Sequence, residues 1–412
     1  MSTRDHGPLE LVLRHEHGRI VASLMREFGA HRLAIVEDAI GQALLEGTTA
    51  WRTRGVPPHA RAWIHRAARH RVIDELRRRH REEGLDGAPE PAVAADDGEA
   101  ALAGDVHDDE LRALFACAEP SIPLASQIVF ALRGLCGFST REIAMRLVTS
   151  EANVQKRFER ARDRLREVDL QRVPDASEWP DRADAVLRMI YVLFTEGYFA
   201  SSGDRVLRLE LCREALRLAE LVVAHPRASS SNALALLALM RLHHARRDAR
   251  VDAEGEPVAI EEQDRRRYHR RELVEALDVL QTATRGGLAS KYHIEAAIAA
   301  EHAFAPNFEA TRWATIHGLY QRLVQLEPSP LHELHAAIAL SYAEGPGAGL
   351  AHLEKTRPPT WLRESHLWLA TYADLHRRLG DLDRAREYYD RALAIAPENE
   401  RRMLSRRRAA LA

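Results

Sequence analysis

The sequence lacks the features that define several large classes of protein. Cysteine occurs only three times in 412 residues, at Cys117, Cys136 and Cys212, and never with C-x-x-C spacing. A disulfide framework and a zinc knuckle are therefore not expected. No apolar run approaches the length of a membrane span or of a signal-peptide core. We therefore predict a cytoplasmic protein that has no membrane partner.

An excess of charge of one sign is missing too, because 59 lysines and arginines face 61 acidic residues. This balance excludes a uniformly basic coat for nucleic acid, so any DNA-binding surface must be local. Signatures of catalysis are equally scarce. The sequence has no P-loop and no G-x-S-x-G, and "LHELH" places His332 and His335 three positions apart, whereas zinc proteases need about four. We predict that the protein is not an enzyme and binds no cofactor or metal.

Helical periodicity is what the sequence does contain, along most of its length. A hydrophobic content of 46% is sufficient for real cores, the chain is long enough for more than one domain, and no clear strand signal is present. We therefore predict an all-α protein with four parts. Residues 9–81 form a first helical block, 82–107 a flexible linker, 108–170 a second helical block, and 180–412 a helical extension.

Two short helices with a tight break are predicted from "GFSTREIAMRLVTSEANVQKRFERARDRL" at 137–165. Ser139 and Glu142 have the spacing of a capping box, so the first helix should begin near Thr140, and Ser150 can cap the second helix. The second helix has an apolar stripe of Val154, Phe158, Ala161 and Leu165. Its other positions are mostly basic. The pattern is typical of a helix-turn-helix that enters a major groove, but an ordinary helical hairpin with a solvated basic face has it too.

A second basic stretch, "HARAWIHRAARHRVIDELRRRHR" at 59–81, lies in the first helical block. Its inner stripe is predicted at Trp63, Ala67, Val72 or Ile73, and Leu76. Arginines crowd the other positions, opposed by only Asp74 and Glu75, and this density could neutralise several phosphates. The alternative interpretation is a solvated basic helix with a core tryptophan.

Together, residues 1–170 resemble an RNA polymerase sigma factor of the extracytoplasmic-function type, within the sigma-70 family. "VEDAIGQALLEG" at 36–47 is similar to region 2.2 of that family, and "AWIHRAARHRVIDELRRR" at 62–79 is similar to regions 2.3 and 2.4. The motif at 137–165 is similar to region 4.2. Two such modules in this order, joined by a linker, are more specific than either module alone.

The resemblance implies a set of binding roles, with core RNA polymerase and promoter DNA as the partners. Docking on the clamp helices of the polymerase β′ subunit is implied for Glu37, Asp38 and Gln42, and the β flap is implied as a further contact on the polymerase. Contact with the −35 element is implied for Ser150, Gln155, Lys156, Arg157, Glu159, Arg160 and Arg164. Melting and reading of the −10 element around the loop at 51–60 is implied for Trp51, Trp63, Arg66, Arg69 and His70.

The helical extension has a pattern of its own. In "HLWLATYADLHRRLGDLDRAREYYDRALAIAPENE" at 366–400, small and aromatic residues recur at the spacing of a tetratricopeptide repeat. Segments at 186–201, 237–256 and 261–268 resemble the tetratricopeptide-like C-terminal domain of one sigma-factor group. The resemblance implies that the extension controls the sigma factor, through a regulatory protein or a ligand. We interpret its polar cluster as structural salt bridges in preference to a ligand pocket, and this cluster comprises Glu196, Arg241, Arg246, Arg247, Asp252, Gln263, Asp264 and Arg265.

We therefore predict a transcription initiation factor that binds core RNA polymerase and directs it to promoters, with the extension regulating its activity. The alternative is a stand-alone DNA-binding regulator, or a tetratricopeptide scaffold, that does not bind polymerase. Region 2 distinguishes the two, because a stand-alone regulator needs neither a clamp-docking helix nor a melting loop.

Overall fold

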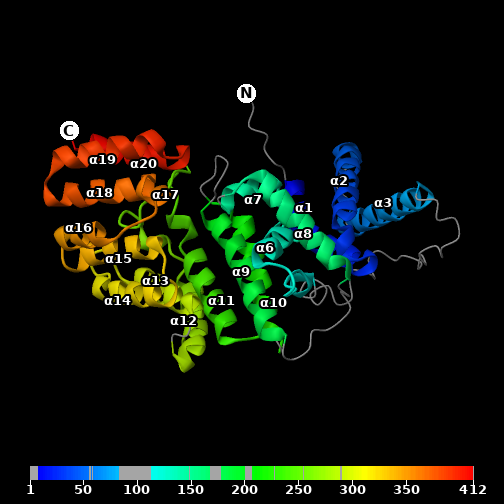
Figure 1. The fold of residues 1–412 in the computed structure, drawn as a ribbon, viewed down its shortest axis with the longest axis horizontal. Helices are drawn as coiled ribbons and strands as arrows, with labels where there is room; N and C mark the ends of the chain where they lie inside the picture. Colours follow the sequence, from blue (N-terminus) through cyan, green and yellow to red (C-terminus); the bar gives the residue numbers. More distant parts are fainter. Residues whose placement is uncertain are drawn as a thin grey trace. The chain divides into compact units, whose positions relative to one another are not determined.

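The computed structural model describes residues 8–54, 57, 59–82, 113–147, 149–167, 178–199, 207–226, 228–253, 255–287 and 290–411. All regular elements in these ranges are helices, apart from an isolated bridge between Val251 and Pro257, which confirms the predicted all-α class. The predicted linker lies outside the described residues from position 83 onward. The chain divides into two compact units: the first comprises residues 1–197 and 209–228, and the second comprises 198–208 and 229–412 (Figure 1).

The first unit begins with three long helices. They are α1 (Pro8–Phe28), α2 (Leu33–Arg54) and α3 (Ala60–Glu82), with a 3-10 turn η1 (Ala30–Arg32) between the first two. Helices α2 and α3 pack along each other, and α1 packs against both. Gly29, at a φ of 92°, provides the left-handed backbone that separates α1 from η1.

The inner face of α3 agrees with the predicted stripe at its centre and differs from it near the start of the helix. Val72 and Ile73 are buried as predicted, but Ile64 and Ala68 are buried where Trp63 and Ala67 were expected, and the last two are only half-buried. Arg69, which was expected outside with the other arginines, is buried with a partner on α1.

The second part of the first unit contains the expected helix-turn-helix. Its helices are α6 (Leu124–Gly134), α7 (Thr140–Arg146) and α8 (Glu151–Arg164), followed by the 3-10 turn η2 (Leu165–Glu167). The capping box is present, because the Ser139 hydroxyl accepts a hydrogen bond from the Glu142 amide and the Glu142 carboxylate accepts one from the Ser139 amide. The four residues of the predicted α8 stripe are all buried: Val154, Phe158, Ala161 and Leu165. The stacked rings of Phe130 and Phe158 join α6 to α8.

Two more helices, α9 (Trp179–Tyr198) and α10 (Leu209–Ala224), follow in the chain. Helix α9 is joined to the helix-turn-helix part by buried charged groups. The Arg182 guanidinium donates to the Glu119 carboxylate (2.5 Å) and to the Phe115 carbonyl (3.0 Å), and Arg146 of α7 lies 3.8 Å from the buried Glu196 carboxylate. The first unit therefore extends past residue 180, where we placed the start of the extension. The domain boundaries themselves stay a prediction.

The second unit consists of helices packed mainly against their neighbours in sequence. They are α11 (Ser231–His244), α12 (Arg270–Ala283), α13 (Lys291–Phe304), α14 (Trp313–Leu326), α15 (Pro330–Ala343), α16 (Pro346–Lys355), α17 (Thr360–Arg363), α18 (His366–Leu379), α19 (Leu382–Ile395) and α20 (Glu398–Ala409). Short 3-10 turns lie at η3 (Arg247–Ala249), η4 (Arg265–Arg267) and η5 (Thr284–Gly286). The best-packed pairs are α11 with α12, α14 with α15, and α18 with α19, and Figure 1 shows α14, α15, α16, α18 and α19 stacked in order.

The hairpin of α18 and α19 is the one that the sequence predicted. Gly380 ends α18 with a φ of 81°, a left-handed conformation that glycine adopts without strain. Ala373, Ala385, Tyr389 and Ala392 are completely buried between the two helices. The small side chains allow the helices to approach, and the tyrosine fills the space that remains.

Candidate nucleic-acid interface

Helix α8 presents a largely basic face to solvent, because its buried stripe of Val154, Phe158 and Ala161 lies on the opposite side. The exposed residues of this face are Gln155, Lys156, Arg160, Asp163 and Arg164. Arg157 and Glu159 lie half-buried at its edges. At the start of the helix, the Ser150 hydroxyl accepts a hydrogen bond from the Asn153 amide (3.2 Å), which confirms the predicted cap. The positive end of the helix dipole adds to the attraction of this face for phosphate.

Two acidic residues accompany this face, and each has a partner on its own helix: Asp163 lies 3.0 Å from the Arg162 guanidinium, and Glu159 contacts Gln155. The Gln155 amide donates to the Glu159 carboxylate (3.0 Å), one helical turn away. The Arg133 guanidinium of α6 donates to the Gln155 carbonyl oxygen (3.3 Å) and lies over the Phe158 ring. These contacts hold Gln155 and Glu159 in place on the α8 surface. The second carboxylate oxygen of Glu159 and the second N–H of the Gln155 amide take no part in these contacts, and either could meet a base.

The three residues assigned to polymerase docking do not share one environment. Asp38 and Gln42 are exposed one helical turn apart on α2, as predicted. Glu37 instead faces α6, where its carboxylate lies 3.2 Å from Arg133 Nε and its side chain is only 16% exposed. Desolvation raises the pKa of Glu37 to about 7, although the adjacent Arg133 lowers it. We therefore correct the assignment of Glu37, which is a packing residue in this arrangement.

Helix α6 can approach α1 and α2 because both sides of the contact have glycine. A Cβ on Gly18 of α1 would lie 2.6 Å from the Leu135 carbonyl oxygen, and a Cβ on Gly134 would lie 2.6 Å from the Leu33 side chain. A larger residue at Gly18 would press on main chain and displace it, whereas one at Gly134 would require the Leu33 side chain to move. The Glu37–Arg133 ion pair thus forms at a close contact between the two predicted sigma modules, which the sequence pattern did not reveal.

The residues assigned to the −10 element are divided in the same way. Arg66 and His70 are exposed on one side of α3, while Trp51 is buried and Trp63 half-buried. The two indole rings meet edge to face, with centroids 5.4 Å apart, so each holds the other in place. Positions 55, 56 and 58 of the predicted loop lie outside the described residues.

Arg69 is not on this accessible side. It is 4% exposed, and its guanidinium donates to both carboxylate oxygens of Glu27 on α1, at 2.7 to 3.0 Å. The neighbouring buried residue His65 shares a hydrogen bond of 3.2 Å with the Ser23 hydroxyl, also on α1. The prediction that Arg69 contacts DNA is therefore corrected: it stabilises the packing of α3 on α1, and it could not be recognised without knowing its partner.

The predicted polar cluster is mostly engaged in structural contacts, and all of its residues except Glu196 lie in the second unit. The Arg246 guanidinium donates to the Gln263 side chain (2.9 Å), and Arg247 donates to the Glu272 carboxylate (2.6 Å). Arg265 donates to main-chain carbonyl groups at the end of α13. These contacts support the interpretation as structural bridges that fix the segment between α11 and α12.

Chemistry of other kinds finds little support in the residues that the structure describes. Within them, no three histidine, cysteine or acidic side chains are grouped closely enough to hold a metal ion. His332 bonds to the Glu327 carbonyl and His335 stacks on Tyr320, so the "LHELH" histidines have different surroundings. Burial raises the pKa of the Cys117 thiol to about 12. None of the described helices combines the length and apolar character that crossing a membrane requires.

Comparisons with known proteins agree with this geometry. Residues 121–165 match the sigma-70 region 4 family, and residues 367–399 match the tetratricopeptide repeat. Residues 182–284 match a family of unknown function, DUF6596. The chain is 37% identical over 401 residues to the "Uncharacterized protein R00370" of Rhizobium meliloti (strain 1021), which covers 95% of this chain and 93% of that protein. No solved structure matches the chain.

Proposed function

We propose that this chain, which belongs to the family of that Rhizobium meliloti protein, is a transcription initiation factor. The proposal proceeds from its sigma-70 region 4 and its tetratricopeptide repeat. The factor is of the extracytoplasmic-function type, binds core RNA polymerase and directs it to promoters with −35 and −10 elements. The second unit regulates this activity. The observation that carries the proposal is the capped helix α8, with its exposed basic face, inside the segment that matches region 4.

Helix α8 supplies the −35 contacts in this proposal. Arginine and lysine can donate to the O6 and N7 atoms of guanine in the major groove, and both Lys156 and Arg160 are exposed at its centre. Arg164, one turn further on, is placed to meet a phosphate. A base contact and a phosphate contact differ in what their loss changes, because only the first carries sequence information.

This difference can be measured with two matched variants. Arg160→Ala should lower the preference for the −35 sequence by roughly 1–3 kcal/mol, as expected for a bidentate base contact. Arg164→Ala should weaken binding to all sequences alike. It should also reduce the slope of log affinity against log salt concentration by about one, the value for one lost phosphate contact. Binding to a randomised −35 library at several salt concentrations gives both quantities. Identical sequence profiles for the two variants would remove the distinction.

Polymerase binding is assigned to the exposed pair on α2. The double variant Asp38→Arg with Gln42→Ala should lose association with core polymerase while keeping its helical circular dichroism spectrum, since both side chains lie outside the core. The matched control is Asp74→Arg, which makes the same charge change at an exposed position of α3. Co-elution of the double variant with core polymerase at wild-type affinity would refute this docking assignment. Sequence-specific DNA binding by the wild type without any polymerase association would favour the stand-alone regulator.

A further inference from the structure

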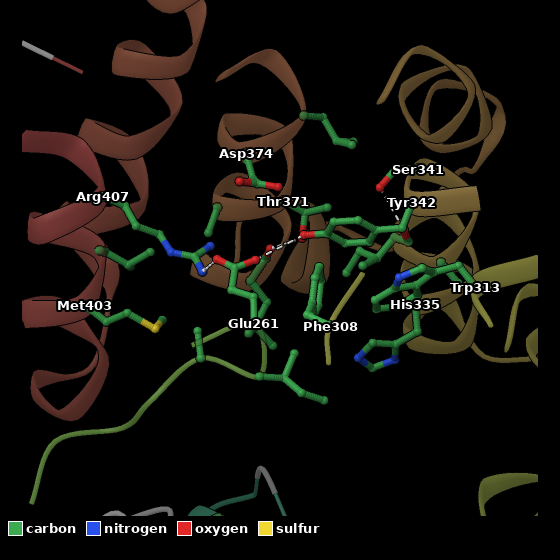
Figure 2. Close-up of a pocket in the computed structure, with 18 of the residues that line it drawn as sticks. Glu261, Phe308, Trp313, His335, Ser341, Tyr342, Thr371, Asp374, Met403 and Arg407 are labelled. Carbon is green, nitrogen blue, oxygen red and sulfur yellow. Dashed lines mark hydrogen bonds and ion pairs between the residues drawn. The ribbon is translucent and has the colours of Figure 1, made fainter. Parts of the chain in front are cut away.

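The second unit encloses a cavity to which neither the sequence motifs nor the matched families assign a role. Its volume is about 320 Å³, which is within the range of sites for small organic ligands. Helices α14, α15, α18 and α20 form its walls, and the segment at 259–261 closes one side (Figure 2). All of these elements belong to the second unit.

One wall of the cavity is aromatic. The rings of Trp313 and Tyr342 stack with centroids 4.5 Å apart, and Phe308 meets each of them edge to face at 5.1 Å. Aromatic faces attract cations, and this wall already holds one, because the Arg378 guanidinium lies 4.0 Å from the Tyr342 centroid. The wall can therefore hold an apolar body and tolerates positive charge.

The opposite end of the cavity is acidic. The Glu261 carboxylate accepts hydrogen bonds from the Tyr342 hydroxyl (3.3 Å) and from the Arg407 guanidinium of α20, as Figure 2 shows. Asp374 and Glu400 also line the cavity, but Asp374 already pairs with the Arg377 guanidinium (2.7 Å), and the Glu400 carboxylate lies 3.1 Å from His366 Nε2. A cation therefore binds at this end in exchange for one of these existing partners, as with Arg407 on Glu261.

Desolvation lowers the pKa of His302 to about 3, so this histidine of the lining carries no charge at neutral pH. His335 also lines the cavity, and it is exposed there. In the described part of the chain, the buried His302 Nδ1 has no hydrogen-bond partner. It is available to a polar atom of a bound molecule.

Arg407 indicates which chemistry the acidic end accepts. Its guanidinium is an internal cation held by Glu261, in a cavity that its own helix helps to form. A second pair, Arg402 with Glu256, joins the same helix to the same loop, but neither of these residues lines the cavity. Release of Arg407 from Glu261 would therefore leave α20 attached at Arg402, and the space beside Glu261 would open to another cation.

We propose that this cavity binds a small organic cation, with a flat apolar body against the wall of Phe308, Trp313 and Tyr342 and an ammonium or guanidinium group on Glu261. The bound cation replaces Arg407 as the partner of Glu261. This inference goes beyond the proposed role in transcription, and binding can be measured without polymerase or DNA.

Three probes that share an indole ring distinguish the contribution of the apolar ring to the affinity from that of the charged group. Tryptamine is a cation, indole-3-acetate is an anion, and indole is neutral. Calorimetric titration of the full chain should give saturable binding of tryptamine, about tenfold or more tighter than that of the other two, because a charge-assisted hydrogen bond contributes that much. Equal or tighter binding of indole-3-acetate, or no saturable binding of tryptamine, would overturn the proposal.

Variants locate the site. Glu261→Gln keeps the shape of the side chain and should weaken tryptamine binding about tenfold, whereas Glu256→Gln removes the other loop carboxylate that holds α20 and should leave binding unchanged. Arg407→Met should tighten binding, because it removes the internal competitor. Equal losses in the two glutamine variants would mean that the carboxylates only hold α20, and would refute the assignment. Should Glu261→Gln not fold, Trp313→Leu gives the same test through the aromatic wall, and unchanged affinity there would refute it equally.

Discussion

Replacing Glu37 with glutamine should change how the stability of the first unit depends on pH. The Glu37 carboxylate is buried beside Arg133, and desolvation raises its pKa from 4.5 to about 7. The folded state thus binds this proton more tightly than the unfolded state does. The stabilising contribution is complete below pH 4.5 and is lost as the pH rises through about 7.

The size of the effect follows from the two pKa values. A tenfold change in proton affinity corresponds to about 1.4 kcal/mol, so the difference amounts to roughly 3 kcal/mol. Between pH 4.5 and 8, the unfolding free energy of the wild type should therefore fall by roughly that amount relative to Glu37→Gln. Glutamine has the same shape and does not ionise, while all other titrating groups are shared and cancel in the comparison.

Urea unfolding followed by tryptophan fluorescence measures this difference. A background with Trp313, Trp361 and Trp368 changed to Phe leaves only tryptophans of the first unit as reporters. Asp38→Asn is the matched control for the loss of one carboxylate, because this neighbouring side chain is exposed. If Glu37→Gln remains parallel to the wild type at every pH, the buried contact with α6 is not present in solution.

Three further changes test other parts of the account. Arg69→Met should lower the unfolding free energy of the first unit by about 1–3 kcal/mol in urea, because it removes the charge-assisted hydrogen bonds of a buried guanidinium to Glu27, whereas the exposed Arg66→Met should change it by less than about 0.5 kcal/mol; equal effects would contradict the separation of these two arginines. Ser150→Ala should cost about 1 kcal/mol of stability and weaken −35 binding, and unchanged values for both would argue against a capped α8 at the DNA. Ala392→Pro should lower the stability of the second unit by about 3 kcal/mol or more, and circular dichroism should show its thermal transition at a lower temperature. An unaltered transition would mean that the last hairpin is not part of the core of this unit.

Features set by neighbours in sequence could be predicted. Ser139 and Glu142 are three residues apart, and Val154 and Phe158 are four apart, so the caps and the buried stripe of the helix-turn-helix follow from local spacing. The α18–α19 hairpin could be predicted for the same reason, because Gly380 lies at the turn between two periodic segments.

Features set by partners far apart in sequence could not be predicted. In the sequence, Arg69 looks like the other arginines of α3, such as the exposed Arg66. Only the approach of Glu27 from α1 makes its burial favourable. Glu37 was assigned to polymerase docking together with Asp38, because its partner Arg133 lies far away in the sequence, in the other module. The cavity of the second unit depends likewise on the return of α20 to the loop that carries Glu261.

The most direct measurement of the central claim is transcription by purified components. Core RNA polymerase, the full-length protein and a library of genomic DNA fragments are incubated together, and the 5′ ends of the transcripts are sequenced. The account predicts transcripts that start downstream of one shared pair of −35 and −10 elements, that require the added protein, and that disappear with the Asp38→Arg, Gln42→Ala variant. Transcript starts that are the same with and without the protein would contradict the claim that it directs polymerase to promoters.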